Sequence, residues 1–458
     1  MKMNRYTIHI CLLAFIILLF GSCKIGKSYV RPQIEIPDVG KQLSDSASLG
    51  DKDWYEIYTD EPLRALIGKA LIRNSDMKIA VARIKEMAAR KRIKVAGLLP
   101  EVDANITAER EFENDGGDNS KQSNTFGAKA ALSWELDLWG NLRWGKDAAV
   151  AEYMQTIEAR RALQMTLVAE VATAYYELVA FDNELNIVRQ TLEARREGVR
   201  LARLRFEGGL TSETSYRQAQ VELARTATLI PDLEREITLK ENDIAFLVGE
   251  FPNQITRSTL LQEFLLPDVL PAGLPSALLV RRPDIRQAEQ SLIAANAEVG
   301  VAYTNLFPRI TLTGRYGLES SELSDLLNSP YGLLQGALLG PIFSSGKNMA
   351  LLKAQKAVFE QEGYQYEKSV LNAFREVRNA IVNYSKIKEI CVLQANLEQS
   401  SKSYMELAQL QYINGVINYL DVLDAQRSYF DAQISLSNAI RDEWIAVVEL
   451  YKALGGGW

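Results

Sequence analysis

The sequence predicts an α+β fold in which one unit of helices and strands occurs twice. Three observations predict it. Matching residues recur in the same order in both halves of the chain. The stretches 141–206 and 347–412 contain no proline and carry helical patterns, and the segments 101–109, 125–138 and 309–319 alternate between apolar and polar residues. Each half therefore reads as a helix, two strands, a very long helix, a glycine-containing turn and a second long helix.

The duplication becomes visible when the chain is aligned with itself at a shift of 204 to 208 residues. The matching positions are 73–80 with 281–288, 98–100 with 306–308, 138–143 with 342–347, Leu204 with Leu410, Phe206 with Tyr412, Gly209 with Gly415 and Gly249 with Gly455. A colinear series at a nearly constant offset indicates a repeat. We place the first repeat at 61–248 and the second at 283–458, with a proline-rich connector at 249–282.

The helix predicted over 141–206 would be about 100 Å long, which exceeds what any compact core requires. Its apolar stripe keeps alternating spacings of three and four residues, the heptad seam of a left-handed coiled coil. The seam consists of Leu167, Val171, Ala174, Leu178, Phe181, Leu185, Val188 and Leu192, and the second repeat has Val370, Phe374, Val377, Ile381 and Tyr384 at matching spacing. The sequence therefore predicts two long coiled-coil arms.

Four strands are predicted in each chain, at 101–109, 125–138, 309–319 and 331–343. The first three alternate, while 331–343 is apolar on both faces. Each has about nine to fourteen residues, which is long enough for a tilted strand to cross a bilayer. No segment after residue 22 has the run of about eighteen apolar residues that a spanning helix needs, so strands would have to make the crossing.

Four strands cannot close a barrel, because the smallest membrane barrels have about eight, and open edges are not tolerated in lipid. The transmembrane β-barrel must then be shared among several chains. The helices, facing water, would continue it as a long α-helical coiled-coil barrel. Such an arrangement is a conduit.

The chain begins like an exported protein. Lys2 and Arg5 precede an apolar run at 10–20, two small residues and then Cys23, the layout of a secretory signal over 1–22. Eleven apolar residues would cover only about 16 Å as a helix, too short to span a bilayer. The position of Cys23 resembles a bacterial lipobox, although Phe20 stands where leucine is usual. We expect 23–60 to be a lipidated segment; the alternative is an ordinary signal with an incidental cysteine.

Residue usage argues against an enzyme. The only histidine, His9, leaves with the signal, which excludes an imidazole base or metal ligand. Cys11 leaves too and Cys23 would carry lipid, so Cys391 has no intrachain disulfide partner. No catalytic cluster stands out, and we expect no cofactor and no metal.

The net charge argues against nucleic acid as a partner, and the one nucleotide-binding motif in the sequence is misleading. Loss of Lys2 and Arg5 takes the net charge from −6 to −8, which does not favour nucleic acid. The segment 21–28 fits the pattern of a phosphate-binding loop. Signal cleavage would cut it, and Pro32 and Pro37 interrupt any helix that follows, so we expect no nucleotide site.

With these pieces in place, the chain resembles the outer-membrane-factor channels, or TolC-like proteins, and especially their lipid-anchored OprM/NodT-type branch. The resemblance covers essentially the whole mature chain. Its carriers are Cys23 with Tyr29-Val30-Arg31-Pro32, Arg281-Arg282-Pro283-Asp284-Ile285, Glu135-Leu136-Asp137-Leu138-Trp139-Gly140, Pro341-Ile342-Phe343 with Gly346, Asp421 through Gln426, and Leu450 through Trp458. It implies a homotrimer with a twelve-stranded barrel, an equatorial connector and a helical tunnel. It also implies a periplasmic adaptor and an inner-membrane pump as partners, and export of small molecules such as drugs through an outer membrane.

The resemblance further places two helix-to-helix turns at the periplasmic tip, where family members contact the adaptor. They are Gly208-Gly209-Leu210-Thr211 and Asn414-Gly415-Val416. Glycine is what a turn ending such a helix requires, because it accepts positive φ. The alternative is that these glycines only end the helices.

Asp421 and Asp424 fall where similar channels place aspartate rings at a narrow periplasmic gate. Three copies of each would attract cations; the alternative is that Asp421 only caps a helix. Tyr412 matches a tyrosine of the lock that closes some family members. The arginine and aspartate of that lock are replaced here by Ile417 and Ser215.

Three functions compete. The first is the outer-membrane channel of a tripartite efflux system. The second is the exit duct of a type I protein secretion system, and the third is a periplasmic coiled-coil scaffold without a pore. The lipidation signal and the segment 29–32 favour efflux, and the alternating strands argue against the scaffold. The transported substrate cannot be read, since a passive duct leaves selectivity to its pump.

Overall fold

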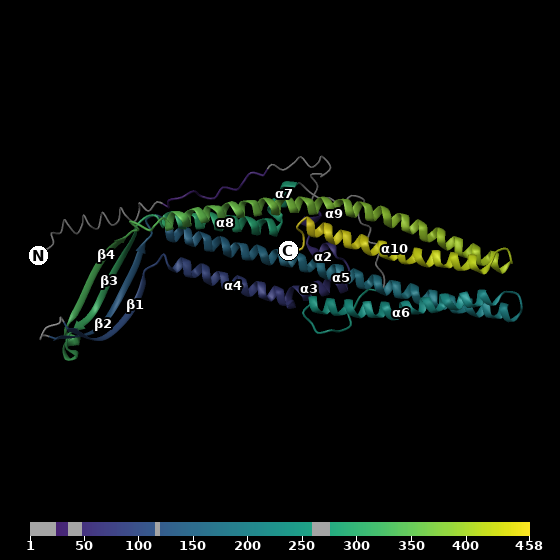
Figure 1. Ribbon diagram of the computed structural model, residues 1–458, viewed down its shortest axis with the longest axis horizontal. Helices are drawn as coiled ribbons and strands as arrows, with labels where there is room; N and C mark the ends of the chain where they lie inside the picture. Colours follow the sequence, from purple (N-terminus) through teal and green to yellow (C-terminus); the bar gives the residue numbers. More distant parts are fainter. Residues whose placement is uncertain (1–23, 35–47, 115–119, 259–274) are drawn as a thin grey trace. The chain divides into compact units, whose positions relative to one another are not determined.

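The computed structural model describes residues 24–34, 48–114, 120–258 and 275–458, and its two halves contain the same elements in the same order (Figure 1). The first half has α4 (Ser75–Ala96), β1 (Glu101–Asn114), β2 (Ser120–Leu136), α5 (Asn141–Glu207) and α6 (Glu213–Leu247). The second has α8 (Pro283–Thr304), β3 (Arg309–Ser320), β4 (Pro330–Leu339), α9 (Lys347–Ile413) and α10 (Tyr419–Ala453). The short elements are η1 (Leu49–Asp51), α2 (Trp54–Ile57), α3 (Glu61–Arg73), α7 (Pro275–Arg281) and η2 (Leu323–Asn328).

Corresponding helices of the two halves have equal lengths. α4 and α8 have 22 residues each, α5 and α9 have 67, and α6 and α10 have 35. The predicted α+β fold with an internal duplication is therefore confirmed. The long helices end one residue after the predicted limits of 206 and 412.

The chain divides into two compact units. The first includes 24–34, Arg83–Ile157 and Gln287–Lys368, and so contains the sheet; the second includes 48–82, Glu158–Arg286 and Ser369–Trp458. The long helices contribute residues to both.

The sheet is antiparallel with strand order β1-β2-β3-β4, so β1 and β4 are its edges. Continuous pairing, from Glu101↔Ser133 to Asn114↔Ser120 and from Phe126↔Ser320 to Leu136↔Ile310, keeps side chains of one face in register. One face carries Val102, Ala104, Ile106, Ala108, Phe126, Ala128, Ala130, Leu132, Trp134, Leu136, Ile310, Leu312, Tyr316, Leu318, Leu334 and Leu338. The other carries most of the charged and hydroxyl residues, which is the alternation that the sequence predicted.

The strand limits differ from the predicted ones. β1 extends to Asn114 and β2 begins at Ser120, so both strands include residues of the polar segment 114–123, because backbone pairing tolerates polar side chains on exposed strands. β4 ends at Leu339 instead of 343, since Pro341 has no amide hydrogen to donate to a neighbouring strand. The polar segment 319–329 contains the 3₁₀ turn η2.

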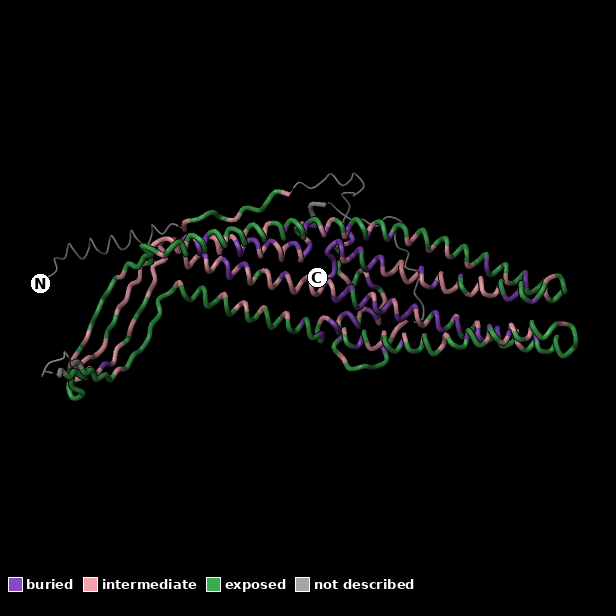
Figure 2. The backbone as a smooth tube through the Cα atoms, viewed as in Figure 1, coloured by how far each residue is buried: buried purple, intermediate pink, exposed green. Residues whose placement is uncertain are grey.

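The core of the second unit lies along the predicted seams. Seven of the eight seam residues of α5 are buried, and Phe181 packs against them. On α9, Val370, Val377 and Tyr384 are buried, and Phe374 and Ile381 pack against the core. Buried residues follow the helices, whereas the strands of the single chain are mostly exposed or half-buried (Figure 2).

Candidate functional site

The turn between α5 and α6 and the turn between α9 and α10 share one backbone geometry. Gly209 follows the end of α5 with φ +70°, and Gly415 follows the end of α9 with φ +75°. The amide after each glycine donates to a carbonyl oxygen five residues earlier, at 2.8 and 2.9 Å. This ending satisfies helix carbonyls that otherwise lack partners, and it requires a residue that tolerates positive φ.

The turns are also exposed. Leu210 is 74% exposed and Val416 is 69% exposed. Gly208, Gly209, Asn414 and Gly415 are exposed, and Thr211 is half-buried. Each turn thus presents a short apolar surface that nothing covers within the described residues, as a contact point for a partner would.

Asp421 and Asp424 lie one helical turn apart at the start of α10, and both are exposed. The Asp421 carboxylate accepts a hydrogen bond from the amide of Asn418 at 3.0 Å, which closes a capping box. The capping role is therefore present. It uses one carboxylate oxygen of an exposed side chain, so it is compatible with a second role facing an aqueous entrance.

Tyr412 belongs to an apolar cluster beneath the turns. Its ring lies 5.3 Å from that of Tyr419, and the Arg205 guanidinium lies 4.4 Å above it. Ile417, at the position of the lock arginine, packs on the same cluster. The Tyr412 hydroxyl is buried and has no hydrogen-bond partner in the described part of the chain. Ring contacts and apolar packing, and not an ion pair, therefore hold Tyr412 in place.

An ionic cluster of Arg195, Glu222 and Arg427 lies farther along the same helices, and the Arg427 side chain is 43% exposed. Arg195 and Glu222 are 8% and 3% exposed, and their side chains are 3.0 Å apart. Arg427 donates to the other Glu222 oxygen at 2.5 Å. The hydrogen bond from Arg427 holds the pKa of the Glu222 carboxyl below its ordinary value. The cluster ties α5, α6 and α10 together.

Sequence reasoning missed this cluster, although a signal existed. Ala219, Glu222 and Thr226 follow spacings of three and four, so two polar residues occupy seam positions of α6 and both are buried. A glutamate in a seam needs a buried partner. The partners could not be read, because Arg195 and Arg427 are distant in sequence.

The residues 29–32 that supported the family resemblance bind one buried carboxylate in the first unit. Arg31 donates two hydrogen bonds to Glu289 of α8, both at 2.6 Å, and the Tyr29 hydroxyl donates a third at 3.2 Å. Closer to the start of the segment, Trp144 of α5 donates to the carbonyl oxygen of Ile25 at 2.8 Å. The extended segment 24–34 is therefore fixed along helices of this unit. Cys23 lies outside the described residues.

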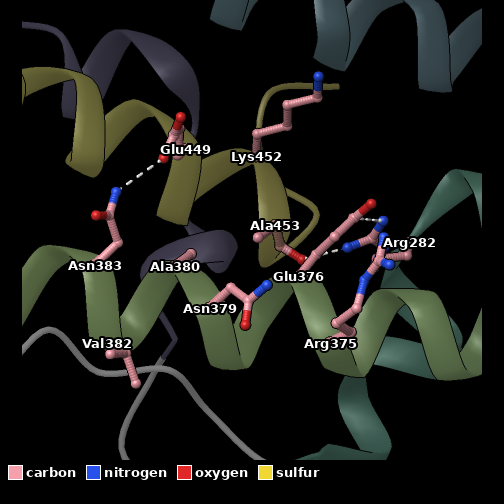
Figure 3. A pocket seen from close by; sticks show the side chains of 10 residues that line it. All are labelled: Arg282, Arg375, Glu376, Asn379, Ala380, Val382, Asn383, Glu449, Lys452 and Ala453. Carbon is pink, nitrogen blue, oxygen red and sulfur yellow. Dashed lines mark hydrogen bonds and ion pairs between the residues drawn. The ribbon is translucent and has the colours of Figure 1, made fainter.

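The motif at 281–285 holds three helices of the second unit together. Arg282 is 3% exposed and donates to Asp284 at 2.7 Å, to Glu376 of α9 at 2.6 Å and to the carbonyl oxygen of Ala453 at 2.9 Å. A polar pocket of about 690 Å³ lies beside it, where Asn383 donates to Glu449 (Figure 3). Gly456 is required because a Cβ there would lie 2.2 Å from the Tyr451 ring. The terminal motif therefore has a packing role.

Among the described residues, none of the helices combines the length and the apolar character needed to cross a bilayer.

A four-stranded sheet with one apolar face and long helices that end in exposed turns are what we expect of a membrane-channel subunit. A family profile described as "Outer membrane efflux protein" matches residues 66–250 and 274–456. OprJ, an outer membrane protein of Pseudomonas aeruginosa, is 34% identical over 97% of this chain and 95% of its own length. TtgC, a probable efflux pump outer membrane protein of Pseudomonas putida, is 31% identical over 100% of this chain and 96% of its own.

Solved structures agree. The outer-membrane channel OprN superposes with a TM-score of 0.89 at 28% identity, covering 95% of this chain and all of that one. The open state of the MtrE outer membrane channel of Neisseria gonorrhoeae superposes with a TM-score of 0.87 at 29% identity, covering 95% of this chain and 98% of that one.

The chain belongs to the outer membrane efflux protein family. It is an outer-membrane channel component of an efflux system, so the predicted family, the outer-membrane location and the efflux function are confirmed, and the secretion duct and the scaffold are not favoured. These relatives are channel and efflux proteins and not enzymes.

Proposed function

We propose that three copies of this chain form one duct, to which each contributes four strands of a twelve-stranded barrel and the helices of a periplasmic tunnel. The duct works with a periplasmic adaptor and an inner-membrane pump and releases small molecules such as drugs. The observation that carries this proposal is the open sheet, whose edge strands β1 and β4 have no further strand beside them among the described residues.

An open sheet cannot remain in lipid as it is. Unpaired amide and carbonyl groups at the edges of β1 and β4 cost several kcal/mol each in the absence of water. Pairing β1 of one copy with β4 of the next removes both edges, and the apolar face from Val102 to Leu338 would then meet lipid. Three copies reach twelve strands.

Native mass spectrometry of the detergent-solubilised protein tests the assembly. Several chains per particle are expected because only a closed barrel satisfies every edge, and the family resemblance sets their number at three. A monomer that keeps its full strand content by circular dichroism would contradict the shared barrel.

We propose that Cys23 carries the lipid anchor. The signal layout supports this, and so does the fixation of 24–34 along α8, because a docked segment directly after the cysteine would hold the anchor at a set distance from the helices. Mass spectrometry of the mature N-terminal peptide should show an acylated Cys23. An unmodified cysteine, or cleavage at another bond, would refute the anchor.

We propose that the turns at 208–211 and 414–416 contact the adaptor, and that Asp421 and Asp424, with Tyr412 packed behind them, line the periplasmic gate. Exposure of Leu210 and Val416 supports the first role. Exposure of both aspartates on one side of α10 supports the second. Tyr412 contributes by holding α9 against Tyr419.

A further inference from the structure

A pocket of about 480 Å³ opens between α5, α6 and α10, away from the turns. Val188, Leu229, Leu233, Phe430 and Ile434 form its apolar wall, and Ser435 lines it beside them. Pro231 interrupts the hydrogen bonds of α6 at this level, because it has no amide hydrogen to donate. The volume lies within the range of small-molecule pockets, about 300–1,000 Å³.

Glu184 of α5 is the feature that needs an explanation. Its side chain lines the pocket, is 9% exposed, and makes no hydrogen bond or ion pair within the described residues. Arg441 acts on Glu184 through its charge, but its hydrogen bonds go to Asn438 at 2.7 Å and to Asp442 at 2.8 Å. A buried carboxylate without a partner is costly, and burial raises the pKa of Glu184.

The surroundings define what could pair with this carboxylate. Asp232 and Asp431 are exposed residues that also line the pocket, and Asp232 pairs with Arg235, which is not one of the lining residues. The charged side chains that line the pocket are all acidic and favour a cation. A bare metal ion would leave the apolar walls uncovered, and a neutral apolar molecule would leave Glu184 unpaired. An organic cation with a bulky apolar body satisfies both, and the ring of Phe430 can pack against it.

We propose that this pocket binds amphiphilic organic cations, with Glu184 pairing their positive charge. The nine residues that line the pocket all belong to one chain. This inference goes beyond the proposed function, because it gives the helical wall a ligand-binding site of its own.

The full-length protein in zwitterionic lipid nanodiscs tests this by equilibrium dialysis, with empty nanodiscs subtracted. The probe is tetraphenylphosphonium, and tetraphenylborate has the same shape with the opposite charge. Saturable binding of the cation only is expected, and Glu184→Gln should weaken it about tenfold, which corresponds to about 1.4 kcal/mol, because the variant lacks the charge that pairs with the probe. The matched control is Glu193→Gln, an exposed acid of the same helix that pairs with Arg196, and it should bind like the wild type.

A second variant tests the pocket independently, in case Glu184→Gln does not fold. Ser435→Trp keeps every charge and fills the pocket, so it should abolish binding. The proposal is overturned if Glu184→Gln or Ser435→Trp binds like the wild type. It is also overturned if both probes bind equally, or if the wild type binds no cation above empty nanodiscs, as when a side chain of a second copy fills the pocket.

Discussion

At the scale of single residues, charges in this chain have different surroundings that predict different roles. Glu222 is buried between two arginines, Glu184 is buried without a partner, and Asp421 and Asp424 are exposed at a helix start. Glu222 stabilises the contact between its helices. Glu184, Asp421 and Asp424 are the carboxylates for which we propose roles in binding cations.

Replacing both Asp421 and Asp424 by alanine should reduce cation selectivity, because rings of carboxylates at an entrance attract cations. Loss of charge at the helix start should cost only about 0.3–1 kcal/mol per site, so assembly should survive. Planar-bilayer recordings would compare reversal potentials in a salt gradient and block by multivalent cations. Glu213→Ala, at the start of α6, is the control. Unchanged selectivity and block in the double variant would leave Asp421 with the capping role alone.

Replacing Glu222 by glutamine should lower the free energy of unfolding by about 3 kcal/mol, because Arg195 would remain buried without its carboxylate. The pKa of Glu222 is depressed in the fold, so its contribution is present above the unfolded pKa and is lost as the pH falls through the native value. Denaturant titration followed by circular dichroism measures both effects. Glu197→Gln, an exposed acid paired with Arg200, should change stability by less than about 0.5 kcal/mol. Equal stability of the two variants would contradict the role of the cluster.

At the scale of elements, the turns determine where each long helix ends. Gly209 and Gly415 were predicted from their spacing and from the chemistry of helix ends, and both have positive φ. The heptad seams were predictable because burial repeats every three or four residues. The limits of β1, β2 and β4 were not predictable from the same pattern. β1 and β2 continue into polar residues because pairing uses the backbone, and β4 ends before a proline that the apolar pattern does not take into account.

Gly209→Ala should destabilise the turn by about 1 kcal/mol, since a Cβ is unfavourable at positive φ. Gly363→Ala is the matched control, because Gly363 lies inside α9 with open space around a new Cβ and should gain about 0.5–1 kcal/mol. Hydrogen exchange of the peptides flanking each site reports the two effects. Exchange at the end of α5 that does not rise in Gly209→Ala would contradict this account of the turn.

At the scale of the whole molecule, the duplication, the sheet and the paired helices were readable from sequence because each repeats over many residues. The ionic cluster and the Glu184 pocket were not readable, because they depend on side chains from three helices that meet only in the fold. The motif Arg281-Arg282-Pro283-Asp284 indicated the family but not what its residues do. The structure shows that Arg282 connects helices through hydrogen bonds to Glu376 and to the carbonyl oxygen of Ala453.

The equal lengths of corresponding helices restrict how this protein can change in evolution. A seven-residue insertion in α5 alone would extend it by about 10 Å past α6. To keep the seam in register, α6 would need a matching insertion. The same insertions would be needed in α9 and α10 to keep each helix as long as its counterpart, as the 67-residue and 35-residue pairs are now. An insertion in one helix alone should therefore be harmful, and tolerated length variation should be confined to segments outside these four helices.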